Sequence, residues 1–186
     1  MAHARRGENR GPGAAAENRA ALIAAAREVF AADGYRAPLA SITKAARVGQ
    51  GSLYRHFPDR VSLALAVFAD NMTELEALAE RPDVTLDEVL AMLTDHTIAS
   101  TAFVDMVADA GLDERVVVIR DRVTHILEAP LARAQAEGLV RAEIGAGDLM
   151  LAIEMLAGAL RHTPEEHRVR AAAQAWKLMR NGFAAG

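Results

Sequence analysis

Hydrogen-bonding side chains are concentrated in one short segment, VGQGSLYRHFPDR, residues 48–60. No carboxylate pair, no nucleophile beside a base and no phosphate-binding glycine loop accompanies them, so the parts of an enzyme active site are missing. Amides, hydroxyls and cations are instead the groups that bind base edges and phosphates. The segment therefore indicates recognition of a nucleic acid rather than catalysis. Its candidate contact residues are Gln50, Gly51, Ser52, Tyr54, Arg55, His56 and Arg60.

The segment is expected to form the third of three short helices. A helical apolar pattern runs from Glu17 to a stop at Gly34, and Pro38 begins a second helix over 38–46. A turn over 47–49 leads into the third helix, 50–56. Two helices joined by a three-residue turn and braced by a preceding helix have the spacing of a helix-turn-helix.

A helical wheel divides the third helix into two sides. Leu53 and Phe57 lie together, flanked by Tyr54 and Gln50, and are expected to pack onto the two preceding helices. The opposite side carries Gly51, Ser52, Arg55 and His56. Lys44 faces outward on the second helix and adds a cation. The polar side is therefore expected to be free to enter a groove of DNA.

The charge distribution is uneven along the chain. Residues 1–60 hold 10 basic and 5 acidic side chains, a net charge of +5, and the remainder holds 11 and 20, a net charge of −9. A basic head on an acidic body is expected when only the first part of a protein approaches a polyanion. Chance clustering, helped by the arginines of an irregular terminus, is the competing explanation.

The composition favours an all-α protein of about nine helices. Of the 186 residues 52 % are hydrophobic but only 4 % are aromatic, and no alternating pattern typical of a strand follows residue 16. Three domains are predicted: a disordered basic arm over 1–16, a helix-turn-helix domain over 17–60, and a larger helical domain over 61–186. There is no cysteine, and no uncharged run exceeds nine residues. We therefore expect a cytoplasmic protein without a membrane span.

The sequence SITKAARVGQGSLYRHFPDR, with AAREVFAADGY before it and VSLALAVF after it, resembles the TetR family of bacterial transcriptional regulators. The family's Leu-Tyr-x-His-Phe run appears as Leu53 to Phe57, followed by a basic residue at Arg60. The specific match covers about residues 19–68. Two positions depart from the family pattern: Arg47 replaces the usual glycine of the turn, and Gly49 replaces a helix-capping serine or threonine.

The resemblance implies roles for individual residues. Gln50 would read a base edge, and Ser52 a base or a phosphate. Tyr54, His56, Arg60 and Lys44 would contact phosphates, and Arg55 a phosphate or a guanine. Tyr54 as a packing residue and His56 as a favourable helix C-terminal residue are the alternatives. Basic residues of the arm, Arg5, Arg6 and Arg10, would lie in a minor groove or remain solvated.

The larger domain is implied to contain a pocket for a small apolar or amphipathic effector. Candidate lining residues interrupt its apolar stripes with methionine, imidazole or an aromatic ring, groups that suit adaptable apolar pockets. Placement in an ordinary core is the alternative for each of them. No pair of histidines has metal-ligand spacing, so neither a metal nor another cofactor is expected. The candidates are Met72, Met92, His96, Phe103, Met106 and His125.

The last two helices, expected over 148–161 and from the HTPEE segment, 162–166, to about Asn181, have broad apolar faces. Such faces need a partner, which is either the chain's own core or a second subunit. The resemblance implies a twofold dimer through a four-helix bundle. Candidate interface residues are Leu149, Ile153, Leu156, Ala157, Leu160, Val169, Ala173 and Trp176.

Three functional hypotheses follow from these patterns. The first is a repressor that binds a pseudo-palindromic operator as a dimer and is released by a small molecule. The second is a ligand-independent DNA-binding regulator whose acidic body recruits a protein partner. An α-helical enzyme is the third, and the missing catalytic constellation argues against it.

Overall fold

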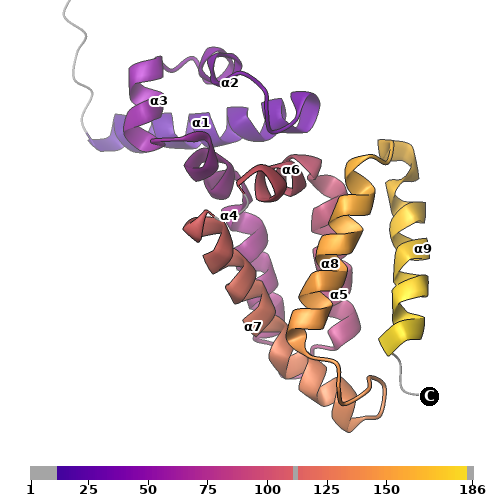
Figure 1. Ribbon diagram of the computed structural model, residues 1–186. Coiled ribbons are helices and arrows are strands. Elements are labelled where there is room, and N and C mark those ends of the chain that lie inside the picture. Colours follow the sequence, from indigo (N-terminus) through magenta and orange to yellow (C-terminus); the bar gives the residue numbers. More distant parts are fainter. Residues whose placement is uncertain (1–11, 111–112, 184–186) are drawn as a thin grey trace, which may run out of the picture. The chain divides into compact units, whose positions relative to one another are not determined.

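The computed structural model describes residues 12–110 and 113–183, and in this part of the chain nine α-helices follow one another without a strand (Figure 1). The all-α prediction is confirmed. The helices are α1 (Pro12–Asp33), α2 (Leu39–Ala46), α3 (Gln50–His56), α4 (Arg60–Ala79), α5 (Leu86–Ala99), α6 (Thr101–Ala110), α7 (Glu114–Ala136), α8 (Ala146–Arg161) and α9 (Glu165–Phe183).

The helix boundaries differ from the sequence pattern mainly at the two ends of the chain. α1 begins at Pro12, five residues before the expected Glu17, so the last part of the segment expected to be disordered is helical. Residues 1–11 of the predicted arm, including Arg5, Arg6 and Arg10, lie outside the described residues. α9 continues through Gly182, which was expected to end it.

A capping box made by Thr85 and Glu88 fixes the start of α5. The backbone amide of Glu88 donates to the Thr85 hydroxyl at 3.2 Å, and the amide of Thr85 donates to the Glu88 carboxylate at 2.8 Å. Both bonds satisfy amides that the first turn of a helix leaves without a partner. The Thr85 amide lowers the pKa of the Glu88 carboxyl below its usual value, and so does the Thr85 hydroxyl, which donates to the same carboxylate at 2.9 Å, because both bonds stabilise the charged form.

The chain divides into two compact units, with the boundary inside α4 after Val67. The boundary expected from the sequence, at residue 60, lies seven residues earlier. The first two turns of α4 therefore belong to the first unit. The second unit begins at Phe68 and contains the rest of α4 with α5 to α9.

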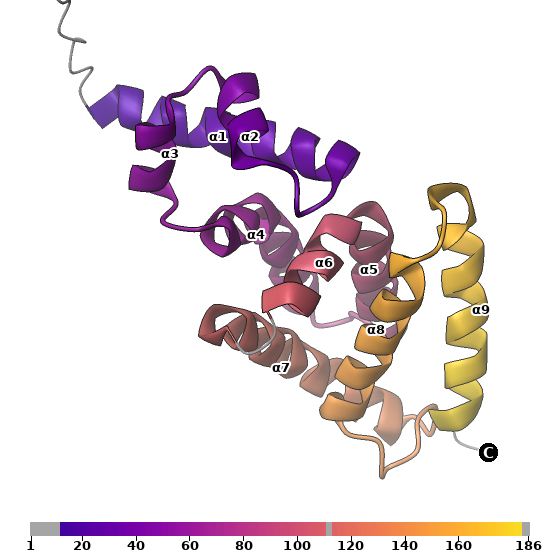
Figure 2. The same ribbon diagram turned by 45° about the horizontal axis from the view of Figure 1, so that its top comes forward.

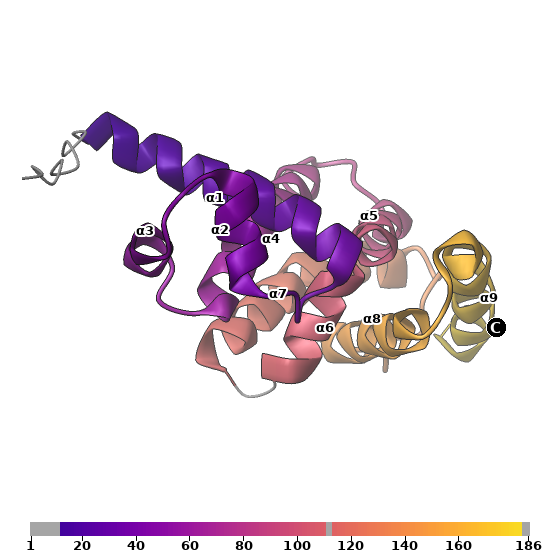
Figure 3. The same ribbon diagram turned by 90° about the horizontal axis from the view of Figure 1, so that it is seen from above.

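The first unit packs α2 and α3 across α1 (Figures 1 and 3). Its core is a set of side chains that are at most 5 % exposed and that come from all four of its helices and from the turn after α1. This core holds two short helices that could not be stable in isolation, because helices of this length are marginal in water. The core residues are Leu22, Ala26, Phe30, Tyr35, Ile42, Leu53, Phe57, Leu63 and Val67.

The second unit surrounds one apolar core with helices α4, α5, α7, α8 and α9, and α8 and α9 run side by side (Figures 1 and 2). Leu75, Leu127, Leu149 and Leu156 are at most 1 % exposed at its centre. Ion pairs at the rim join helices that are distant in sequence: Arg120 with Glu154, Arg122 with Glu76, Arg161 with Asp105 and Arg180 with Asp87.

Two kinds of feature are absent from residues 12–110 and 113–183. No helix there is long and apolar enough to cross a membrane. No three or more histidine, aspartate or glutamate side chains are grouped so that they could hold a metal ion.

Candidate nucleic-acid interface

A three-residue turn, residues 47–49, joins α2 to α3. α2 ends because Arg47 adopts a left-handed conformation with φ of 55°. The amides of Arg47 and Val48 then donate to the carbonyls of Lys44 and Thr43, at 3.2 and 3.0 Å. Glycine usually occupies such a position, and another residue there costs roughly 1–2 kcal/mol of backbone strain. The departure of Arg47 from the family pattern therefore leaves the turn intact.

Gly49 forms the N-terminal cap of α3 in an extended conformation, with φ of −69° and ψ of 151°. Its carbonyl accepts from the amides of Ser52 and Leu53 at 2.9 and 3.1 Å. No side-chain hydrogen bond caps the helix, as expected from the missing serine or threonine. Backbone geometry alone therefore starts α3.

Leu53 and Phe57 hold α3 onto the rest of the first unit, as the helical wheel predicts. The two side chains are 1 % and 3 % exposed. The guanidinium carbon of Arg19, from α1, lies 5.3 Å from the centre of the Phe57 ring, within the range of a cation–π contact. The orientation of α3 is thus fixed from one side, which decides the side that it offers to a partner.

The exposed arc of α3 consists of Gln50, Gly51, Tyr54 and Arg55. Tyr54 is 53 % exposed although it is a large aromatic residue. This arc differs from the predicted division of the helix. Gln50 and Tyr54 were expected to flank the buried side, and Ser52 and His56 to lie outward. The structure instead places Ser52 and His56 on the half-buried edge of the helix.

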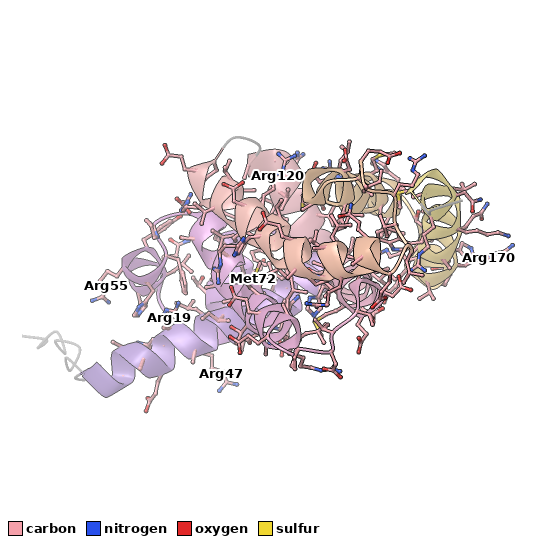
Figure 4. All side chains as sticks on the ribbon, turned by 90° about the horizontal axis from the view of Figure 1, so that it is seen from below. Arg19, Arg47, Arg55, Met72, Arg120 and Arg170 are labelled. Atoms are coloured by element: carbon pink, nitrogen blue, oxygen red, sulfur yellow. The ribbon has the colours of Figure 1, made fainter. Side chains whose placement is uncertain are left out.

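The side chains of the exposed arc of α3 have unused hydrogen-bonding capacity. The amide group of Gln50 has no hydrogen-bond partner among the described residues. Arg55 donates through Nε to the Gly51 carbonyl at 3.2 Å, which leaves the two terminal nitrogens of its guanidinium for a ligand. Figure 4 shows the side chains of Arg47 and Arg55 extending away from the ribbon. Lys44, on α2, is exposed as well.

Gly51 lies within this arc, and no atom of the described residues explains why it is glycine. A Cβ built there would meet no heavy atom within 4 Å. Close packing against a neighbouring helix is therefore not the reason within the described part of the chain. The open space leaves the backbone of α3 accessible at this position.

Arg60 does not extend outward with the other predicted contact residues. Its side chain is half-buried, and its terminal nitrogen Nη1 donates to the carbonyl oxygens of Tyr35 and Ala37 at 2.6 and 2.5 Å. Its guanidinium carbon also lies 5.6 Å from the centre of the Tyr35 ring. The sequence could not signal these contacts, because they join α4 to a turn that lies more than twenty residues earlier.

The predicted effector-binding residues have three different surroundings in the second unit. Met106 is fully buried, whereas Met72 and Met92 are half-buried and pack against the main core. His96 is paired with the Glu74 carboxylate through Nε2 at 3.3 Å. Figure 4 shows Met72 inside the outline of the second unit.

Of the two remaining effector candidates, one is exposed and the other has a side chain outside the described residues. The side chain of His125 is 83 % exposed, and its Nδ1 lies 2.9 Å from the Glu128 carboxylate on the same helix. His125 therefore lies at the surface of the second unit. The side chain of Phe103 lies outside the described residues.

A cavity of about 530 Å³ lies between the turn before α5, the C-terminal part of α7 and the segment that follows it. None of the six predicted effector residues lines it. Its apolar wall includes Val84, Leu86, Leu90 and Val140, and its charged lining consists of Arg133 and Arg180 together with Asp83, Asp87 and Glu137. We call it the Leu90 cavity. Its size is within the usual range of small-molecule sites.

Most of the predicted interface residues lie in the core of their own unit. Leu149, Ile153, Leu156, Leu160 and Trp176 are at most 9 % exposed, and Ala157 is half-buried. The Trp176 indole donates to the Thr94 hydroxyl at 2.7 Å. Only Val169 and Ala173 of the predicted set are exposed.

A second apolar stripe covers the outward face of α8. Leu151 and Met155 are 52 % and 60 % exposed, and Gly158 and Ala159 follow them on the same side of the helix. On α9, Val169 is 67 % exposed. We call Leu151, Met155, Gly158, Ala159 and Val169 the α8–α9 face. Its spacing of i, i+4, i+7 and i+8 on α8 was present in the sequence, but the inward stripe has the same period and larger side chains.

Comparison with known proteins identifies the first unit. Residues 22–67 match the family model for "Bacterial regulatory proteins, tetR family". The HTH-type transcriptional regulator SrpR of Pseudomonas putida is 34 % identical over 137 residues, which are 67 % of this chain and 64 % of that regulator. This chain thus matches just under two thirds of the length of SrpR.

Two further similarities extend beyond the first unit. The uncharacterized HTH-type transcriptional regulator TtgW, also of Pseudomonas putida, is 36 % identical over 107 residues, which are 54 % of this chain and 79 % of that protein. The crystal structure of the TetR transcriptional regulator SCO0520 from Streptomyces coelicolor superposes with a TM-score of 0.55 at 26 % identity. That superposition covers 90 % of this chain and 98 % of the other.

The matched family segment coincides with the structural unit that presents α3. It begins at Leu22 in the core of α1 and ends at Val67, the last residue of the first unit. The chain belongs to the TetR family of bacterial regulatory proteins and is a DNA-binding transcriptional regulator, not an enzyme.

Proposed function

We propose that this regulator is a cytoplasmic repressor that binds a pseudo-palindromic operator as a homodimer and is released by a small apolar or amphipathic molecule. The observation that carries the DNA-binding part is the exposed arc of α3, in which polar groups with unused hydrogen-bonding capacity lie opposite the buried anchors Leu53 and Phe57. A helix anchored on one side and polar on the other fits the width of the major groove.

The contacts divide between bases and phosphates. Gln50, at the first position of α3, is placed to make paired hydrogen bonds to a base edge, and Arg55 to reach a guanine or a phosphate. Exposed Tyr54 and Lys44 serve phosphates. Ser52 and His56, on the half-buried edge, reach only groups that approach along that edge. Gly51 allows the DNA backbone to come close to the helix.

Dimerisation uses the α8–α9 face in this proposal. Support comes from its composition: exposed Leu151 and Met155 form one apolar strip, and Gly158 lets a second helix approach closely. A twofold axis through α8 would place the strip of one protomer against that of its partner, which is the self-complementary contact that a symmetric dimer requires. Two protomers would then offer two copies of α3 to two half-sites.

The effector has two candidate sites in the second unit. One comprises Met72 and Met92, whose flexible thioethers pack against the core, with half-buried His96 and buried Met106 as the further candidate contacts. The other is the Leu90 cavity, which combines an apolar wall with a charged lining of two arginines and three carboxylates. A ligand acts only if it prefers one conformation of the dimer, and such couplings typically amount to about 1–3 kcal/mol.

Selection of bound sequences from random DNA tests the operator proposal. We expect a site with twofold symmetry whose half-site centres are about one helical turn, or a multiple of it, apart. Affinity for this site should exceed that for random DNA by at least about 10³ at physiological salt. A selected site without symmetry would contradict binding as a symmetric dimer, and selection of no sequence would contradict the operator itself.

Effector release is tested by titrating a panel of small apolar and amphipathic acids and amines onto the complex with the selected operator. A true effector must weaken operator affinity, and the operator must weaken effector binding by the same factor. Two variants separate the candidate sites: Leu139→Trp at the exposed rim of the Leu90 cavity, and Met92→Trp beside the core. The variant that abolishes the response while retaining DNA binding identifies the site. If no compound acts on the wild-type protein, the ligand-independent regulator with a protein partner is favoured.

A further inference from the structure

The turn between α1 and α2 contains two carbonyl groups that accept hydrogen bonds from a side chain of α4. The turn starts at Gly34, which adopts a left-handed conformation with φ of 79°. Tyr35 and Ala37 are then 5 % and 4 % exposed. Buried carbonyl groups in native structures are nearly always paired, since an unpaired one costs the free energy of a lost hydrogen bond. Pro38 follows Ala37 and has no amide hydrogen to offer.

Arg60 supplies the donor for both carbonyls. The two hydrogen bonds come from one nitrogen, Nη1, which carries two hydrogens, so both are used within the chain. The guanidinium also lies over the Tyr35 ring, 5.6 Å from its centre. A cation at the first residue of a helix is unfavourable with respect to the helix dipole. At α4 this cation is drawn back onto acceptors in the turn instead.

These hydrogen bonds connect the residues on either side of the helix-turn-helix. The helix-turn-helix begins just after Ala37, with α2 at Leu39, and it ends just before Arg60, with α3 at His56. One side chain therefore joins the residue that enters this segment to the residue that follows it. The hydrogen bonds of Arg60 therefore hold the two ends of the α2–α3 segment together, and the turn at residues 47–49 lies in the middle of that segment.

We propose that Arg60 is a positioning residue that clasps the two ends of the helix-turn-helix and so sets how α3 is presented to DNA, rather than a phosphate contact. The proposal rests on DNA binding through α3. It differs from the expectation for a basic residue that follows the Leu-Tyr-x-His-Phe run. A phosphate contact would contribute to DNA affinity through its charge, whereas a positioning residue contributes by holding α3 in the orientation that the operator requires. Variants that change the charge and the hydrogen bonds separately distinguish the two roles.

The test compares Arg60→Lys, which keeps the charge but shortens the reach of the side chain and removes the planar guanidinium over the Tyr35 ring, with Arg60→Gln, which removes the charge. Operator affinity, affinity for random duplex DNA and the salt dependence of each are measured on the full chain, well below the melting midpoint of each variant. We expect both variants to lose at least about tenfold in operator affinity. Both should keep the wild-type affinity and salt slope on random DNA, so that the ratio of the two affinities falls.

Lys44→Gln is the matched control, because Lys44 is an exposed cation of the same unit. It should reduce the slope of log K against log salt concentration by about 0.9 per protomer. Binding to the operator and binding to random DNA should weaken by the same factor. Wild-type behaviour of Arg60→Lys together with a slope change of this size in Arg60→Gln would overturn the proposal and make Arg60 a phosphate contact. Lower melting midpoints with an unchanged affinity ratio would overturn it too, since the role would then be structural only. If Lys44→Gln and the wild-type protein showed no salt dependence, DNA binding through this surface would be wrong, and the Arg60 proposal would fail with it.

Discussion

A glutamate at Leu151 or at Met155 is expected to convert the dimer into folded monomers and to lower operator affinity by about 10²–10⁴, because two linked half-site contacts become one. Both side chains are more than half exposed in the protomer, so neither change removes a buried contact of the chain itself. In a dimer formed through the α8–α9 face, twofold symmetry brings the same position of both protomers close to the axis. Each substitution would therefore bury two like charges near each other, which is far more costly than one solvated charge.

Sedimentation at micromolar protein and titration of the selected operator measure the two effects. Val118→Glu is the matched control, since Val118 is also an exposed aliphatic residue, 56 % exposed, but belongs to α7. It should remain dimeric and bind the operator with wild-type affinity. A dimeric Met155→Glu variant would contradict the proposed interface. Monomers that keep full operator affinity would contradict the need for a dimer.

The first unit could be predicted closely from the sequence because its signals are local. The boundaries of α3, the three-residue turn and the burial of Leu53 and Phe57 follow from apolar spacing and from the residues that end helices. The Thr85–Glu88 capping box is equally local, since both of its bonds span three residues. Such features depend on neighbours along the chain, which a sequence displays directly.

The second unit could not be predicted to the same depth because its helices have more than one apolar face. On α8 the inward stripe of Leu149, Ile153, Leu156 and Leu160 and the outward stripe that starts at Leu151 share the helical period. Periodicity shows that a stripe is apolar but not what covers it. The larger stripe is covered by the chain's own core, so the stripe left for a partner is the smaller one.

Arg60 illustrates a related limit within the well-predicted unit. Its position after α3 and its charge both favoured a phosphate contact, and neither property indicates the direction of a long side chain. The acceptors that bind it are carbonyls of Tyr35 and Ala37, and carbonyls are identical in every residue. Only the fold reveals that these two lie within reach of the Arg60 guanidinium.

Gln50→Ala is expected to relax the sequence preference at one base pair in each half-site. Gln50 is exposed at the first position of α3, and its amide has no partner among the described residues, so the side chain enters the complex with a donor and an acceptor available together. That combination matches the major-groove edge of adenine, and a good bidentate pair is worth about 1–3 kcal/mol of discrimination against the wrong base. The operator should therefore be bound about 10–100 times more weakly per half-site.

This effect is measured by comparing affinities for three kinds of DNA: the selected operator, operators changed symmetrically at each position in turn, and random duplex DNA. The variant should lose its preference at one symmetric position, keep it at all others, and bind random DNA as the wild type does, since no phosphate contact is removed. Gln174→Ala, an exposed glutamine on α9, is the control and should change none of these values. An equal loss on every sequence would instead make Gln50 a backbone contact and leave base reading to Arg55, the other residue of the exposed arc of α3 with unused donors.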